Sequence, residues 1–361
     1  MKGYGNMTKE TKFHITRPKD SYRRESFYAG RRRLEDYCGP PTEPDADFDE
    51  LKDWIEGIGP IMTPTIISLQ RDIIRLMRDN GRAINGGWKW MAIDGYSKMG
   101  KTYSVIVAAL LIADALVVDQ PDDVVAPYHH IPVVFIGAPT AATVHARYLL
   151  DKIAIFCGFV LPTRGGLPQL IAKVREMLER FGTLLIVVDD GHFIKRMNGG
   201  RDLTDDLKSI LTEIPVTWVF VGAGLRESAL LHVPSEKSPE FRGTATPSKR
   251  TPARYMAVEQ LKLRMKWRPM VPERVPDDGA PPPQFSYFVT TYVSQLERIP
   301  RLRLGSLRTT GVLTELFRQS AGRPGIATDL LNEIAFEALR QPHSDVGAIA
   351  KRTLAAAHEV R

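Results

Sequence analysis

The 361-residue sequence predicts an α/β fold, in which a parallel sheet flanked by helices is followed by a small helical domain. Three observations lead to this prediction. Short apolar segments alternate with segments of helical periodicity between residues 51 and 268, as expected for parallel strands joined by crossover helices. A glycine pattern typical of phosphate-binding loops stands between the first strand and its helix. Beyond a proline-rich segment, only helical patterns follow.

The composition is that of an ordinary globular protein, with 43% hydrophobic and 25% charged residues. Length alone allows two or three domains. No apolar run reaches the roughly 18 residues that suggest a transmembrane helix, and the N-terminus has no signal-peptide hydrophobic stretch. Cys38 and Cys157 stand at no metal-like spacing, which favours isolated reduced thiols. We therefore expect a cytoplasmic protein without membrane segments.

Residues 1–50 are predicted to form a basic, irregular segment that ends in the linker "CGPPTEPDAD". Two helices then open the next domain, "ELKDWIEGI" and "TPTIISLQRDIIRLMRDN". The second has apolar residues at helical spacing, and Thr63-Pro64 is a favourable helix start. The first strand, "GGWKWMAIDG", leads into the glycine-rich loop, and "TYSVIVAALLIADAL" is the helix that follows this loop.

Further strands are predicted at "HHIPVVFIGAP", "TLLIVVDDGHF" and "PVTWVFVGAG", with helices between them. Gly182 is the expected stop of the helix "GLPQLIAKVREMLERFG". A last strand is predicted at "RYMAVEQLKL", and residues 269–284 are predicted to be a proline-rich linker. The four remaining helical segments give a predicted helical domain at 285–361, after a core domain at 51–268.

The segment "DGYSKMGKT" matches the phosphate-loop pattern G-x-x-x-x-G-K-[ST]. Glycine permits the tight turn that aims backbone N–H groups at a phosphate, and the positive end of the following helix favours an anion. Lys101 is expected to reach the β- and γ-phosphates, and Thr102 to bind Mg²⁺. The predicted nucleotide contacts in this loop are Gly95, Ser97, Lys98, Gly100, Lys101, Thr102 and Tyr103.

A second motif, "LLIVVDD", ends a buried strand in two acids. Asp189 is expected to hold the metal and Asp190 to polarise the attacking water. A surface turn after a strand is the alternative for this pair. No N-K-x-D motif follows, which counts against a GTPase. At the end of "VFVGAG" no residue offers a side-chain donor that could sense the γ-phosphate, and Thr217 comes too early in the strand.

The net charge of +7 favours polyanionic partners. Two basic stretches, 17–33 and 242–268, add to this, although each alone could be a solvated surface. Arg147 and Arg164 are the candidate contacts to the phosphate backbone of double-stranded DNA, with solvent exposure as the alternative. The chain has no zinc finger and no clear recognition helix, so we expect contacts to the DNA backbone and not to the bases.

Over about residues 50–345 the sequence resembles the TniB/TnsC family, AAA+ ATPases of bacterial DNA transposons that are functionally related to the Mu B protein. The segments that carry the resemblance begin with the phosphate loop, the acid pair and "IPVVFIGAPTAATVHARYLLDKIAIFCG". "IPVTWVFVGAG", "ARYMAVEQLKL" and "SAGRPGIATDLLNEIAFEAL" complete them. The resemblance implies an ATP-dependent regulator that polymerises on target DNA and recruits or activates an integrase-like transposase.

The resemblance also implies roles for individual residues. Lys101 and Thr102 bind phosphate and Mg²⁺, and Asp189 is the metal-side acid. Arg254 matches the arginine that acts on the nucleotide of a neighbouring subunit, and Arg323 matches a second arginine that senses nucleotide from the helical domain. The implied protein is cytoplasmic and nucleoid-associated, forms a homo-oligomeric ring or filament, and could meet a target-selection protein.

One position departs from the family pattern, because most members carry Asp-Glu where this chain has Asp189-Asp190. The shorter carboxylate could fall short of the water that it should orient, so we expect slow hydrolysis. His192 follows, where the family often has histidine. Two alternatives stay open: another DNA-associated AAA+ loader or initiator, such as a helicase loader, which should carry a winged-helix domain, and an ATP-binding signalling scaffold with little turnover.

Overall fold

The computed structural model describes residues 22–35, 47–83, 87–118, 130–138, 146–193, 197–198, 201–202, 204–225, 260–277 and 279–359. Within these ranges no helix is long and apolar enough to cross a membrane. Arg254 and most of the basic stretch 242–268 lie outside the described residues.

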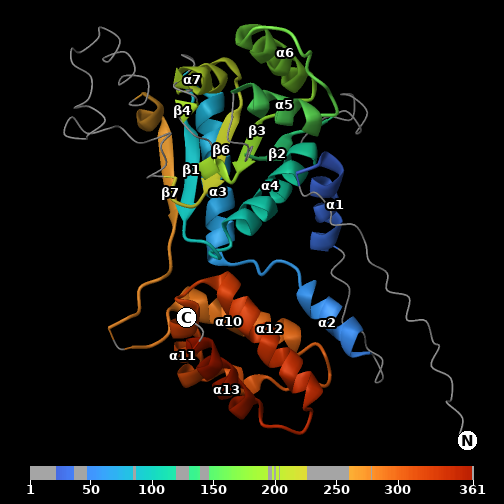
Figure 1. The fold of residues 1–361 in the computed structure, drawn as a ribbon, viewed down its shortest axis with the longest axis vertical. Coiled ribbons are helices and arrows are strands. Elements are labelled where there is room, and N and C mark those ends of the chain that lie inside the picture. The colour runs from blue at the N-terminus through green and yellow to red at the C-terminus, as the bar shows by residue number, and fades with distance from the viewer. Residues whose placement is uncertain are drawn as a thin grey trace, which may run out of the picture.

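A five-stranded parallel sheet forms the centre of the larger lobe, as the sequence predicted (Figure 1). Its spatial order is β2-β3-β6-β1-β7, so β1 lies between β6 and β7. Of the three inner strands, β3 and β6 are buried along their whole length, which explains their continuous apolar sequences. The strands are β1 (Trp90–Gly95), β2 (Val133–Gly137), β3 (Leu185–Asp189), β6 (Thr217–Gly222) and β7 (Met265–Met270).

The position of the last strand was predicted wrongly. Residues 260–263 are helical, and β7 covers Met265–Met270, part of which the sequence assigned to the proline-rich linker. Among the described strands, β7 pairs with β1 alone and is an edge strand, so its other side needs no backbone donors and Pro269 is tolerated there. Met265 and Trp267 pack against the core, while charged residues alternate with them.

The end of β7 approaches β1 so closely that only glycine fits at the start of the phosphate loop. A Cβ atom on Gly95 would lie 1.9 Å from the carbonyl oxygen of Met270. Gly95 pairs with Met270 in the parallel register of the two strands. The first glycine of the loop pattern is therefore needed for strand packing, whatever its role towards a ligand.

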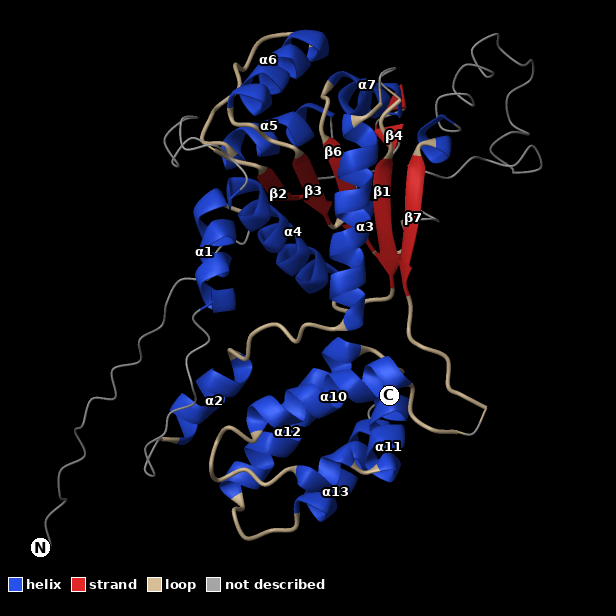
Figure 2. Ribbon diagram, turned by 180° about the vertical axis from the view of Figure 1, so that it is seen from behind, coloured by secondary structure: helices blue, strands red, loops and turns tan. Residues whose placement is uncertain are grey.

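Helices cover the sheet, and Figure 2 shows α3 and α4 in front of it. The hydroxyl oxygen of Thr63 accepts a hydrogen bond from the N–H of Ile66, which confirms the predicted start of α3. Gly182, with a φ of +62°, follows the last turn of α6, also as predicted. The helices and short elements of this lobe are α3 (Pro64–Gly81), α4 (Lys101–Val118), α5 (Ala146–Phe156), α6 (Leu167–Arg180), η1 (Gly191–Phe193), β4 (Met197–Asn198), β5 (Arg201–Asp202) and α7 (Thr204–Glu213).

The prediction of an irregular N-terminal segment was wrong for α1 (Arg24–Glu35), which is a helix packed beside β2 and α4. The ring of Phe27 is buried and stacks on Phe135 of β2, with 5.3 Å between the ring centroids. The Tyr28 hydroxyl donates a hydrogen bond to the carbonyl oxygen of Val133 at 2.9 Å. A few aromatic contacts hold this basic helix, and they are too sparse to give a clear apolar stripe in the sequence.

A second lobe of helices lies below the carboxyl ends of the strands (Figure 1). It has its own hydrophobic cluster, to which Leu51, Ile55 and Ile61 also belong. The helix α2 (Phe48–Glu56) therefore packs with the C-terminal helices, although the sequence grouped it with the core domain. The domain boundaries themselves stay predictions. The C-terminal elements are α10 (Pro283–Leu296), η2 (Gly305–Arg308), α11 (Thr310–Ser320), α12 (Pro324–Arg340) and α13 (Val346–Glu359).

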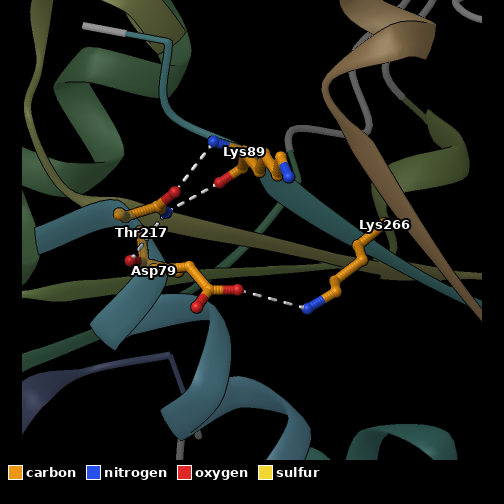
Figure 3. A network of polar contacts seen from close by, with 5 residues as sticks. Asp79, Lys89, Thr217 and Lys266 are labelled. Carbon is orange, nitrogen blue, oxygen red and sulfur yellow. Dashed lines mark hydrogen bonds and ion pairs between the residues drawn. The ribbon is translucent and has the colours of Figure 1, made fainter. Parts of the chain in front are cut away.

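A buried asparagine near the end of α3 joins this helix to the sheet. The Asn80 amide donates to the Lys89 carbonyl at 2.8 Å and to the Thr217 hydroxyl at 3.1 Å, and its oxygen accepts from the Lys89 N–H. Figure 3 shows this network beside the exposed ion pair between Asp79 and Lys266, whose charged atoms are 3.8 Å apart. The buried and the exposed contact thus lie within one small region.

We expect Asn80→Ala to lower the free energy of unfolding by about 2–3 kcal/mol, since it leaves buried polar groups without partners. Lys266→Ala should cost no more than about 1 kcal/mol, because an exposed ion pair contributes little. Urea denaturation followed by tryptophan fluorescence measures both values. Equal effects of the two substitutions would contradict the assignment of this network as a structural link.

A second prediction concerns the contact between β1 and β7. Gly95→Ala should destabilise the protein by about 3 kcal/mol, because the new Cβ collides with the Met270 carbonyl. Gly100→Ala is the matched control, since Gly100 has a φ of +75° but no atom within 4 Å of an added Cβ. This control should cost only the strain of a left-handed residue, about 1–2 kcal/mol. Similar losses for both variants in the same denaturation experiment would show that the close approach is unimportant.

Candidate functional site

The phosphate-loop residues lie between the carboxyl end of β1 and the first turn of α4, as the sequence predicted. The loop requires unusual backbone angles, with a φ of +65° at Lys98 and +75° at Gly100. Ser97 and Tyr103 are exposed on the loop and on the first turn of α4. Because α4 begins at Lys101, its N-terminal N–H groups and helix dipole are available to an anion held by the loop.

Lys101 lies at the carboxyl end of β1, and Thr102 at the carboxyl end of β3. The Lys101 ammonium donates hydrogen bonds to the carbonyl oxygens of Gly95 at 2.8 Å and of Tyr96 at 2.7 Å. Burial lowers the pKa of Lys101, while the nearby carboxylates of Asp94 and Asp189 act in the opposite direction. The lysine is thus held over the loop by its own backbone, close to a group of acids.

Asp189 ends β3 and is almost completely buried, with 2% of its surface exposed. Its Oδ1 atom accepts hydrogen bonds from the Thr102 hydroxyl at 3.1 Å and from the Asp190 N–H at 2.9 Å. Burial raises the pKa of this carboxyl group, and these hydrogen bonds oppose the shift. A hydroxyl and a carboxylate in contact form a suitable pair for Mg²⁺, which takes few protein ligands and completes its shell with water and phosphate oxygens.

Asp190 follows in a left-handed conformation, with a φ of +53°. It is half-buried and lies near enough to Lys101 and Asp189 to affect their electrostatics. Aspartate is among the few residues with a side chain that adopt such angles readily. The chain therefore turns sharply at the acid pair, directly after β3, and continues into η1.

Two side chains hold the loop after β6: Asp94, which the sequence did not identify as important, and His192, which the sequence noted beside the acid pair. The Asp94 Oδ1 atom accepts a hydrogen bond from the Leu225 N–H at 3.1 Å. The His192 Nδ1 atom accepts a weaker one, at 3.4 Å, from the Ala223 N–H. Thr217 lies at the opposite end of β6 and bonds to Asn80, so it is no candidate for a phosphate sensor. Residues of β1 and η1 thus set the position of this loop.

A cavity of about 510 Å³ adjoins the phosphate loop, between the sheet and the helical lobe. Its walls are largely apolar, as expected of a pocket for a small molecule. Four segments contribute to it: the residues around the start of α3, the phosphate loop with α4, the end of β7 with the residues after it, and the C-terminal helices. Representative lining residues are Ile61, Met99, Tyr103, Met270, Phe288 and Asn332.

The helical lobe touches the phosphate loop directly at the start of α12. The Gly325 N–H donates to the Lys98 carbonyl at 2.9 Å, and the Lys98 ammonium lies 3.1 Å from Asp329. Arg323 stands just before α12, with its guanidinium 5.3 Å from the centre of the Tyr96 ring. Its Nε atom is buried without a hydrogen-bond partner, and a donor in this position suits an anionic ligand.

The two predicted DNA contacts differ in their surroundings. The Arg147 guanidinium donates to the carbonyl oxygens of Pro162 and Thr163 and pairs with Asp151. These bonds fix the turn that follows α5 and occupy much of its donor capacity. Arg164 is exposed two residues further along the same turn. Whether either arginine contacts DNA stays a prediction.

No protein-family model and no curated protein matches this sequence. Among solved structures, the chain is similar to the ORC1 protein of Aeropyrum pernix in complex with DNA, with a TM-score of 0.51 and 16% identity over 84% of this chain and 67% of that one. It is less similar to Cdc6p of Pyrobaculum aerophilum, with a TM-score of 0.46 and 15% identity over 79% and 64% of the two chains.

PCH-2 of C. elegans has a TM-score of 0.47 and 12% identity over 88% of this chain and 72% of that one. At such low identities a likeness concerns the fold alone. The ORC1 match and the order of the five parallel strands agree with the predicted fold class. The chain has the AAA+ P-loop fold, with a parallel sheet flanked by helices and a helical C-terminal region.

Proposed function

We propose that this protein binds ATP with Mg²⁺ and hydrolyses it slowly. The observation that carries the proposal is the contact between the Thr102 hydroxyl and the Asp189 carboxylate, at the end of the loop that holds Lys101. These three groups supply the cation for the phosphates and the two oxygen ligands for the metal. Mg²⁺ would neutralise charge on the phosphates during transfer to water.

The remaining parts of the site have matching roles in this proposal. Asp190 orients the attacking water, and the buried, unpartnered Nε of Arg323 offers a donor to the phosphates from the helical lobe. The apolar cavity beside the loop accepts the adenine base and ribose. Arg254 acts on the nucleotide of a neighbouring subunit, so nucleotide binding and assembly would depend on one another.

We further propose that the protein is a transposition regulator, which oligomerises on double-stranded DNA and recruits or activates an integrase-like transposase. The resemblance of the sequence to the TniB/TnsC family supports this finer assignment, and the net charge of +7 supports binding to a polyanion. The ORC1 structure of similar fold was solved in complex with DNA. ATP hydrolysis would then dismantle the assembly.

The nucleotide site is tested by separating binding from turnover. Lys101→Ala should weaken the binding of a fluorescent ATP analogue at least about tenfold, since a charged contact to the phosphates is lost. Asp190→Asn should bind within about twofold of the unsubstituted protein, because asparagine tolerates the same backbone angles. It should release phosphate about 10²-fold more slowly, because the water loses its polarising group.

Phosphate release by the unsubstituted protein at the level of Lys101→Ala would exclude an ATPase and favour the ATP-binding scaffold. Unchanged hydrolysis by Asp190→Asn would instead show that another group orients the water.

If the protein assembles on DNA as proposed, the amount of duplex DNA that it retains on a filter should depend on both ATP and salt. One subunit contacts few phosphates, so only an assembled oligomer should hold duplex DNA firmly. Filter binding of random-sequence duplex, with and without ATP, measures this across a salt series. Affinity should fall steeply with salt and change little with sequence. Equal retention in both nucleotide states would contradict an ATP-gated assembly.

A further inference from the structure

Tyr22, from the segment just before α1, reaches the end of the central sheet at the acid pair. Its hydroxyl donates a hydrogen bond to the Oδ2 atom of Asp189 at 3.3 Å. Its ring lies parallel to that of Phe135, with 5.9 Å between the centroids. The two bonded residues are 167 positions apart in the chain, so this contact exists only in the folded protein.

The two oxygens of Asp189 consequently have different partners. Oδ1 accepts from Thr102 and from the Asp190 N–H, whereas Oδ2 accepts from Tyr22. Rotation of the carboxylate about its Cβ–Cγ bond would break bonds at both oxygens at once. A carboxylate held in this way keeps one defined oxygen beside the Thr102 hydroxyl.

We propose that Tyr22 is a positioning residue for Mg²⁺ binding, which acts through Asp189. The proposal rests on the function inferred above, in which Asp189 and Thr102 serve the metal. Hydrogen bonds to a metal-binding carboxylate orient it and tune its affinity, and their loss typically lowers metal affinity about 10–100-fold. The bond also stabilises the ionised carboxylate, whose burial works against ionisation.

The ring of Tyr22 lies close against the backbone of Gly137. A Cβ atom on Gly137 would lie 2.8 Å from Cε2 of this ring. Gly137 also pairs with Asp189 in the register of β2 and β3, so the ring lies over the strand next to the acid. The ring thus has a defined place beside the sheet, and this place directs the hydroxyl to Oδ2.

Tyr28 provides a matched control on α1. Its hydroxyl, like that of Tyr22, makes a partly buried hydrogen bond, but it bonds to the backbone of Val133 and not to the acid. Tyr22→Phe and Tyr28→Phe each remove one hydroxyl and keep the ring. A general effect of loosening this N-terminal segment should therefore appear in both variants, whereas an effect on the metal should appear only in the first.

The experiment is a Mg²⁺ titration of the full chain with a fixed concentration of fluorescent ATP analogue. We expect Tyr22→Phe to raise the Mg²⁺ concentration at half-saturation about tenfold. The lower end of the usual range applies because 3.3 Å is long for a hydrogen bond between oxygens. Binding of the analogue in EDTA should not change, and Tyr28→Phe should stay within about twofold of the unsubstituted protein in both conditions.

Gly137→Ala is a second, independent variant, which displaces the ring without removing the hydroxyl. Like Tyr22→Phe, it should raise the Mg²⁺ concentration at half-saturation. Adding Tyr22→Phe to Gly137→Ala should then raise this concentration little further. Full additivity of the two changes would overturn the proposal, as would equal titrations for Tyr22→Phe and the unsubstituted protein. Equal shifts for Tyr22→Phe and Tyr28→Phe would also overturn it.

Failure of the proposed function gives a different result. In that case the unsubstituted protein itself would bind the analogue equally well in Mg²⁺ and in EDTA, or would not bind it at all. A normal Mg²⁺ dependence in the unsubstituted protein, retained in Tyr22→Phe, would overturn only the role of Tyr22.

Discussion

The hydrogen bond between the Thr102 hydroxyl and the buried Asp189 carboxylate is the contact around which the site is arranged. A carboxylate with 2% exposure is costly to keep charged unless several donors satisfy it. Here the donors come from the first turn of α4, from the turn after β3 and from the segment before α1. β6 separates β1 from β3 in the sheet, so this contact bridges strands that do not pair with each other. The parallel direction of the strands makes the bridge possible, because it brings their carboxyl ends to one edge.

The helical lobe meets this edge through weaker contacts. The pair between Lys98 and Asp329 is more than half exposed on both sides, so it contributes at most about 1 kcal/mol. The stacking of Arg323 on Tyr96 and the single bond from Gly325 to the Lys98 carbonyl add modest amounts. Tyr96 and Lys98, which lie between the two glycines of the loop, both take part in this junction.

The sequence predicted the parts of the fold in which local pattern and burial agree. The strands β3 and β6, the start of α3 and the stop of α6 follow from apolar runs, Thr63-Pro64 and Gly182. It failed where a segment depends on distant partners. β7 carries a proline that only its edge position permits, and α1 is fixed by a few rings that meet β2. The motifs also singled out Lys101, Thr102 and Asp189, which the structure brings together, although their roles stay predictions. Tyr22, Asp94 and the packing of α2 on the helical lobe belong to no local pattern.

The second acid shows how backbone conformation limits the choice of side chain at a site. Asp190 has a φ of +53°, a region that favours glycine, asparagine and aspartate over longer side chains. A glutamate would reach further, but it would adopt this turn at a higher conformational cost. The turn itself is needed, since it lets the Asp190 N–H bond to Asp189 and leads into η1, where His192 accepts from the loop after β6. The end of β3 therefore links Asp189 to the loop after the neighbouring strand β6 within four residues. An aspartate at position 190 fits this backbone, and the same backbone keeps the carboxylate of that residue short.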